Sequence, residues 1–289
     1  MQAKNTFSFL LLSCLVLLSF STFSKDAQTK KHRTRSFYGS WGYNEEWYTR
    51  STVHVKQPGM GNNYDLVHVQ AQDHKGWDSK SVFKQALTIP QYNYRLGCYF
   101  NQKQDLAIEL NFDHTKYLIS DGQAIHLKGT INHSKVDENI IFSQQNGFYY
   151  YLNNGANFFL INIVKRVGLY HSLDNNLGID LTGKAGVGPV IPHVQNSFFD
   201  SANHQQFQFG GWNTGLETAL RVTVMRYAFI EFSQKVDYAR YSHLEIYNGR
   251  ASQNFGTYEL ILSVGAIIPT TKNNPMFRRQ HATNIIIED

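Results

Sequence analysis

The sequence predicts an all-β protein: a single transmembrane antiparallel up-and-down β-barrel of about ten strands, with roughly 8 to 12 allowed. Apolar and polar residues alternate with a period of two along most of the chain, as in strands with one apolar and one polar face. The polar face carries full charges, although charged residues make up only 17% of the chain, below the roughly 25% of a soluble domain. A mean hydropathy of -0.38 is too polar for a bundle of membrane helices. A barrel, in which every second residue meets lipid, fits these observations together.

The first 24 residues have the order of a secretory signal peptide. Lys4 supplies a positive charge, and residues 7–20 are mostly apolar. Thr22-Phe23-Ser24 then offers small residues where a cleavage site requires them. We expect the chain to divide into a signal peptide (1–24), a basic periplasmic lead-in (25–35), the barrel (36–268) and a polar C-terminal tail (269–289).

The clearest pair of strands lies at residues 89–112. Up to Phe100 the apolar residues share one face and Arg95 lies on the other; after a polar turn, Leu106, Ile108 and Leu110 alternate with Glu109. The positions of Arg95 and Glu109 on either side of one tight turn are consistent with cross-strand neighbours.

The same alternation predicts the remaining strands. They cover residues 37–44, 49–57, 64–73, 159–166, 177–191, 207–224, 227–241 and 258–268, and the first two ranges are either two strands or one long bent one. Short connections are expected in the periplasm, at 101–104, 168–176 and 224–226. Longer ones are expected outside the cell, at 74–88, 121–155, 193–206 and 241–255.

If the apolar faces meet lipid, the charged residues point toward the barrel axis. The predicted interior set is Glu46, His54, Lys56, His68, Arg95, Glu109, Asp113, Arg166, Asp180, Lys184, Glu217, Arg221, Glu231, Lys235, Asp237 and Glu259. A bore of about ten strands is little wider than its own side chains, so opposite charges can pair directly. We predict a lumen closed by an ion-pair network of Arg95, Glu109, Glu217, Arg221, Glu231 and Lys235. The alternative is a soluble sheet whose charges are solvated on its outer face.

Two histidines and an aspartate form a candidate chemical site. His54 and His68 point to one side of adjacent predicted strands, and Asp73 is nearby, so the three are candidate catalytic residues or metal ligands. The simpler interpretation is polar filling of the lumen with satisfied hydrogen bonds. The sequence holds no G-x-S-x-G, H-E-x-x-H or C-x-x-C motif, and we predict no metal and no cofactor.

Several short runs resemble an uncharacterised outer-membrane β-barrel family of Gram-negative bacteria. They are Gly42-Tyr43-Asn44, Ser51-Thr52-Val53-His54, Tyr64-Asp65-Leu66, Ile89-Pro90-Gln91-Tyr92-Asn93-Tyr94-Arg95-Leu96-Gly97, Asp113-His114, Lys116-Tyr117 and Gly186-Val187-Gly188. The resemblance covers most of the mature chain and implies the fold and the cell outer membrane as its location. It implies no activity.

The net charge of +5 is not gathered into a dense basic run with interleaved aromatic residues, so we predict no nucleic-acid partner. We expect a monomer whose partners are outer-membrane lipid and lipopolysaccharide, and the barrel assembly machinery during insertion. The predicted function is a structural or surface-binding role through the extracellular loops. Two alternatives stay open: a lipid-modifying enzyme, and a narrow channel or small-solute transporter.

Overall fold

A computed structural model describes residues 35–76, 90–152 and 155–270. The predicted signal peptide, all but one residue of the lead-in and nearly all of the C-terminal tail lie outside these ranges, as does most of the loop predicted at 74–88. Within the described ranges, no helix has the length and apolar character needed to cross a membrane.

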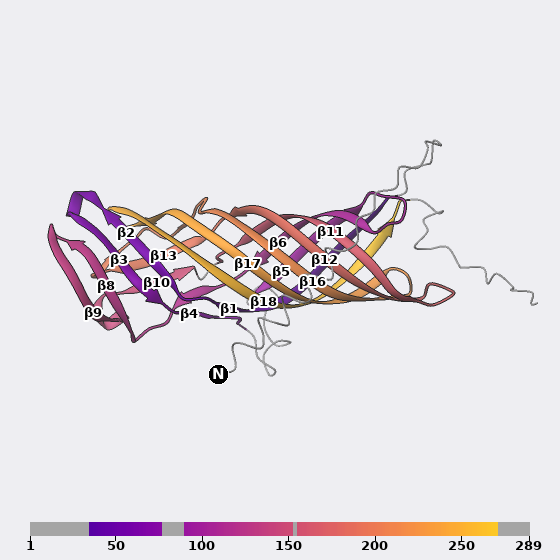
Figure 1. The fold of residues 1–289 in the computed structure, drawn as a ribbon, viewed down its shortest axis with the longest axis horizontal. Helices are drawn as coiled ribbons and strands as arrows, with labels where there is room; N and C mark the ends of the chain where they lie inside the picture. Colours follow the sequence, from indigo (N-terminus) through magenta and orange to yellow (C-terminus); the bar gives the residue numbers. More distant parts are fainter. Residues whose placement is uncertain (1–34, 77–89, 153–154, 271–289) are drawn as a thin grey trace, which may run out of the picture. The chain divides into compact units, whose positions relative to one another are not determined.

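Eight strands form a closed antiparallel barrel, in the order β1-β5-β6-β11-β12-β16-β17-β18, and the pairing of β1 with β18 closes it (Figure 1). Their bounds are β1 Ser36–Tyr48, β5 Tyr92–Tyr99, β6 Leu106–His114, β11 Phe158–His171, β12 Leu177–Val190, β16 Gly211–Val224, β17 Ala228–Ile246 and β18 Gly249–Pro269. Apart from the closing pair, each strand pairs with the next barrel strand along the chain. The predicted up-and-down barrel is therefore confirmed.

The barrel has eight strands, at the low end of the predicted range, because two predicted strands do not form separate passages across it. β2 (Ser51–Gln57) continues in the direction of β1 and pairs with β18. The chain bends between β1 and β2, and a hydrogen bond from the Thr49 amide to the Gly256 carbonyl (2.9 Å) holds this bend. The predicted ranges 37–44 and 49–57 thus follow each other as one long bent strand region, which is one of the two expected possibilities. β3 (Asn62–Val69) pairs back on β2 beyond the barrel wall.

The segment predicted as a loop at 241–255 is instead strand, so that prediction is wrong. β17 and β18 contain 19 and 21 residues and run to a tight turn between Ile246 and Gly249. A tilted strand needs only about ten residues to cross a bilayer. The ends of β17 and β18 next to this turn therefore extend well past the length needed for the barrel wall and carry further structure.

This further structure, called the external module, consists of two sheets. The first extends the barrel sheet from the outer end of β18 through β2, β3, β8 (Gln123–Ile131) and β9 (Ser134–Phe142). The second contains the short strands β4 (Ala71–Asp73), β7 (Tyr117–Ile119), β10 (Tyr149–Leu152), β13 (His193–Phe198) and β14 (Ser201–Ala202), with β15 (Gln206–Phe207) on β13. Two 3-10 turns, η1 (Pro58–Met60) and η2 (Gln144–Asn146), complete it. The connections predicted at 121–155 and 193–206 are thus largely built of strands.

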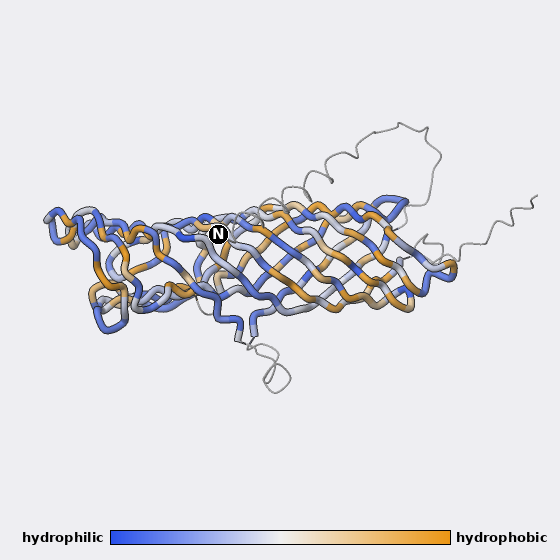
Figure 2. Tube along the Cα trace, turned by 60° about the horizontal axis from the view of Figure 1, so that its bottom comes forward, coloured by the Kyte–Doolittle hydropathy of each residue, from blue (hydrophilic) through white to orange (hydrophobic). Residues whose placement is uncertain are grey.

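An aromatic core holds the external module together. Tyr117 stacks on Phe255 with ring centroids 4.3 Å apart, and Tyr48 and Tyr241 pack on the same Phe255 ring. These residues belong to the larger apolar cluster of the chain, which draws on both sheets. Apolar side chains are therefore buried inside the external module, whereas the barrel wall alternates strongly between polar and apolar residues (Figure 2).

Candidate functional site

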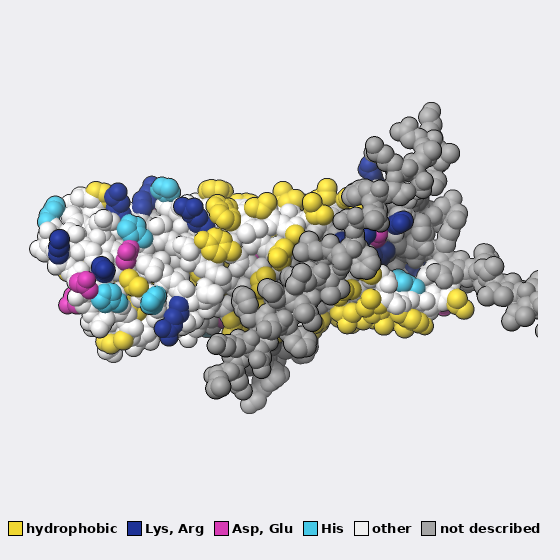
Figure 3. Space-filling view, viewed as in Figure 1, with side chains coloured by type: hydrophobic (Ala, Val, Ile, Leu, Met, Phe, Trp, Pro, Cys, Tyr) yellow, Lys and Arg dark blue, Asp and Glu magenta, His cyan; other side chains and the backbone are white. Residues whose placement is uncertain are grey.

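The barrel wall buries its charged residues and exposes its apolar ones. Arg95 and Glu109 are 2% and 0% exposed, whereas Leu96 and Ile163 are 64% and 66% exposed. Apolar side chains gather along the visible edges of the barrel, and many of the Lys, Arg and His side chains lie on the external module (Figure 3). A closed antiparallel meander with an apolar exterior and a polar interior is the arrangement that lipid requires. The chain is a β-barrel of the outer-membrane type.

Ion pairs fill the middle of the barrel. Arg95 Nη1 lies 2.6 Å from Asp113 Oδ1, and its other nitrogens lie 3.5 Å from Glu217 and 3.8 Å from Glu109. Lys184 Nζ lies 2.9 Å from carboxylate oxygens of both Glu217 and Glu231, and 3.3 Å from Glu109. Each cation is therefore shared among several acids, as burial of charge requires.

Some of these contacts cross the whole bore. Arg95 stands on β5 and Glu217 on β16, strands that lie halfway around the ring from each other. Lys235 on β17 and Asp113 on β6 are opposed in the same way, and their side chains meet at 2.5 Å. Direct contact between opposite walls means that side chains, and not a continuous column of water, occupy the axis at this level.

Aromatic residues occupy the interior toward the short-turn end. Arg221 Nε donates to Glu231 Oε2 at 2.7 Å, and its guanidinium lies over the rings of Phe229 (4.1 Å) and Tyr38 (4.8 Å). Tyr38 donates its hydroxyl to Glu109 at 2.7 Å. Gly97 makes room for Tyr38, because a Cβ there would lie 2.0 Å from the ring. These rings close the bore on one side of the ion pairs.

At the loop end, a hydrogen-bonded junction joins barrel and external module. Asp73 Oδ2 accepts from the Glu46 amide at 3.0 Å, and Asp73 Oδ1 accepts from Gln91 Nε2 at 2.5 Å. Tyr48 donates to Glu46 Oε2 at 2.7 Å. Burial raises the pKa of Asp73 to about 6, although its hydrogen bonds act in the opposite direction. Asp73 thus serves as a structural acceptor at this junction.

The prediction that His54, Lys56 and His68 face the lumen is wrong. All three are exposed on β2 and β3 of the external module, where the core lies behind the sheet, so the polar face turns to solvent. His54 pairs with Asp65, and Asp73 is in the other sheet. No hydrogen bond or ion pair among the described residues joins His54, His68 and Asp73. The described residues hold no group of three or more His, Cys, Asp or Glu arranged for a metal.

No protein-family model and no curated protein matches the sequence. Solved structures show a similar fold. Ail, the attachment invasion locus protein of Yersinia pestis, is 13% identical, and the match covers 82% of this chain and 100% of that one with a TM-score of 0.32. The outer membrane protease OmpT of Escherichia coli is 9% identical, with 87% and 99% covered and a TM-score of 0.38. Neisserial surface protein A is 8% identical, with 80% and 96% covered and a TM-score of 0.29. At these identities the likeness concerns the fold.

The charged residues predicted from the sequence make up only part of the lumen lining. Tyr38, Tyr99 and Phe229 face the interior, and Arg221 Nη1 donates to the Tyr99 hydroxyl at 3.1 Å. The sequence contains this information, because residues an even number of positions apart on one strand point to the same face. Tyr99 therefore shares a face with Arg95, and Phe229 shares a face with Glu231. Aromatic residues occur on both faces of the wall, so only their position in the alternation distinguishes interior ones from lipid-facing ones.

Proposed function

We propose that this protein is an outer-membrane barrel with a closed lumen, and that its role is to present the external module at the cell surface for structural purposes or for binding. The membrane part then serves as an anchor and as a rigid base. Long outer extensions of β17 and β18 give the module a continuous attachment to the wall.

One observation supports closure above the others: side chains from opposite walls touch. The pairs Arg95–Glu217 and Lys235–Asp113 both span the bore. Breaking a buried ion pair costs about 3 to 5 kcal/mol, so such contacts do not open readily to let a solute pass. The narrow-channel alternative would need these contacts to separate.

The lipid-modifying alternative gains no support from the candidate residues. His54 and His68 lie on the solvent face of one sheet and Asp73 in the other, so the three do not form a shared acid–base arrangement. A general base must lie within hydrogen-bond reach of the group it serves.

Conductance in planar bilayers tests the proposal. The full-length protein should show no steady current over a range of voltages. The double variant Arg95→Ala/Lys235→Ala, which removes two contacts across the bore, should show fluctuating current, and Lys165→Ala on the exterior should behave as wild type. A steady conductance of the wild-type protein would overturn the closed lumen.

A further inference from the structure

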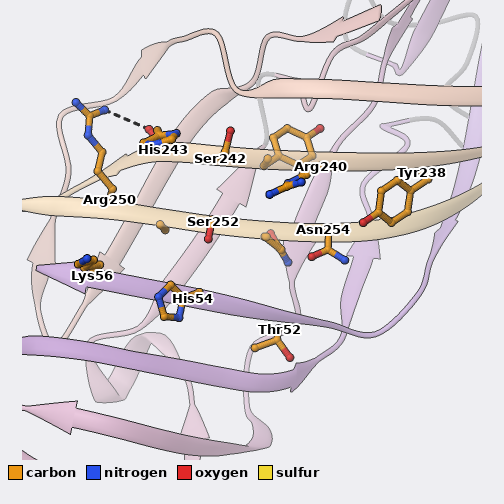
Figure 4. A pocket seen from close by; sticks show the side chains of 13 residues that line it. Thr52, His54, Lys56, Tyr238, Arg240, Ser242, His243, Arg250, Ser252 and Asn254 are labelled. Atoms are coloured by element: carbon orange, nitrogen blue, oxygen red, sulfur yellow. Dashed lines mark hydrogen bonds between the residues drawn. The ribbon is translucent and has the colours of Figure 1, made fainter. Parts of the chain in front are cut away.

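The outer surface of the external module contains an open cleft of about 680 Å³, formed by β2 and by the outer parts of β17 and β18. Side chains from all three strands project into it on one side of the sheet (Figure 4). Its charged lining consists of Lys56, Arg240 and Arg250, with His54 and His243 beside them. Among the described residues, no carboxylate lines the cleft.

Two cations of this cleft lie opposite each other on neighbouring strands. Lys56 and Arg250 are directly opposite each other in the register of β2 and β18. Like charges at such positions are destabilising, unless an anion lies between them. No ion pair of Lys56, Arg240 or Arg250 occurs among the described contacts. Glu245 lies opposite Arg250 in the register of β17 and β18, and its carboxylate accepts from Gln206. Asp65 lies opposite His54 in the register of β2 and β3 and pairs with that histidine.

A bulge in β17 shapes one side of the cleft. The register with β18 shifts between Tyr241 and Leu244, and His243 has a positive φ of 59°. Arg250 Nη1 donates to the His243 carbonyl at 3.1 Å, which fixes the guanidinium over the sheet (Figure 4). Ser252 and Asn254 add neutral hydrogen-bond donors along β18. A guanidinium, an ammonium and several hydroxyl or amide donors suit a phosphate group.

The position of the cleft indicates where that phosphate comes from. Tyr238 lines the cleft and also packs on Trp212, with ring centroids 5.8 Å apart. Both are about 40% exposed on the barrel wall, where Trp and Tyr mark the boundary between hydrocarbon and headgroups. Two residues farther along β17, Arg240 begins the charged surface. The cleft therefore begins at the level at which lipid phosphates lie.

We propose that this cleft binds the phosphate of an anionic lipid headgroup in the outer leaflet. Lys56, Arg240 and Arg250 contact the phosphate, and the acyl chains of the lipid lie against the apolar wall below Tyr238. The site rests on the proposed orientation of the barrel, with the external module outside the cell, and does not depend on closure of the lumen.

Binding of bisphosphorylated lipid A, and of the same lipid after removal of both phosphates, to the full-length protein in detergent tests the site. Wild-type protein should prefer the phosphorylated form by at least about tenfold. The variant Lys56→Gln/Arg240→Gln/Arg250→Gln should bind it about 100-fold more weakly, because each cation near a headgroup contributes about fivefold in affinity. The variant Lys103→Gln/Lys128→Gln/Lys135→Gln removes three exposed charges outside the cleft and should bind as wild type.

Three results would overturn the assignment: no preference for the phosphorylated lipid, equal losses in the two triple variants, or equally tight binding of pyrophosphate or a sulfated polysaccharide. Heat-modifiable migration on gels confirms that each variant is folded. Conductance of the same samples separates the two proposals. A conducting barrel that still prefers phosphorylated lipid contradicts only the closed lumen, and a closed barrel without that preference contradicts only the lipid site.

Discussion

Lys235 Nζ lies 2.5 Å from Asp113 Oδ2, although their strands β17 and β6 stand halfway around the barrel from each other. The same ammonium lies 2.7 Å from Asp237 and 3.8 Å from Glu259. All four side chains are almost fully buried. A single cation thus ties opposite walls together and compensates several acids, which makes it a sensitive point for stability.

Replacing Lys235 by Met should lower the free energy of unfolding by about 3 to 5 kcal/mol, because buried acids lose their partner while the volume is nearly kept. Lys165→Met is the matched control. Lys165 pairs with Asp105 at 2.6 Å on the exterior, so its loss should cost about 0 to 1 kcal/mol. Urea unfolding of the detergent-refolded proteins measures both values. Equal losses in the two variants would contradict a stabilising role of the interior network.

Strand parity predicted the wall of the barrel well. On β5 and β6 the lipid-facing and interior sets fall where the alternation placed them, with Leu96 and Leu110 outside and Arg95 and Glu109 inside. Lipid enforces this pattern, because an unpaired charge on the outer face is costly and the narrow bore has no room for a second layer.

Parity could not predict where the membrane ends. In the external module the same alternation has the opposite sense, since Val53 and Val55 are buried and His54 and Lys56 are exposed. A period of two fixes which residues share a face and leaves open what that face meets. On β18 the interior residues change from Glu259 through Thr257 to the aromatic Phe255. This change from a charged to an aromatic interior marks the end of the barrel, and the positions of the charges alone do not reveal it.

A charge on the outer wall should be costly only if that wall meets lipid. Leu110 is 55% exposed near the middle of β6, so Leu110→Arg should destabilise the barrel by about 2 to 4 kcal/mol in a bilayer. Phe209→Arg is the control, because Phe209 is 72% exposed outside the barrel strands and should tolerate the charge. Folding into lipid vesicles, followed by urea titration, compares the two. If Leu110→Arg left the free energy of unfolding unchanged, water and not lipid would cover this face.

The junction at Asp73 should respond to pH. Its pKa is raised by burial to about 6 in the folded protein, above the ordinary value of 3.8. Between these values the folded state holds a proton that the unfolded state has released, so the stability of the junction falls as pH rises from about 4 to 6. The loss should reach about 2 to 3 kcal/mol. Hydrogen exchange of the β4 and β7 amides across this range measures it.

Asp73→Asn should remove this pH dependence, because the amide keeps an acceptor for the Glu46 N–H without titrating. Asp174→Asn provides the comparison in a fully exposed turn at the opposite end of the barrel. Exchange in the Asp174→Asn variant should retain the wild-type pH profile near β4. An unchanged profile in Asp73→Asn would assign the response to another group.

The external module should unfold without the barrel when its aromatic core is broken. Tyr117 is fully buried, stacks on Phe255 at 4.3 Å and shares a hydrogen bond with Ser51 at 3.1 Å. Tyr117→Ala should therefore destabilise the module by about 3 to 5 kcal/mol. Tyr247→Ala, at a residue that is 43% exposed in the turn between β17 and β18, should cost little. Added protease should cut Tyr117→Ala within residues 115–152 while the barrel keeps its heat-modifiable migration on gels. Loss of that migration together with protease resistance would mean that barrel and module form a single cooperative unit, because the long strands β17 and β18 run through both.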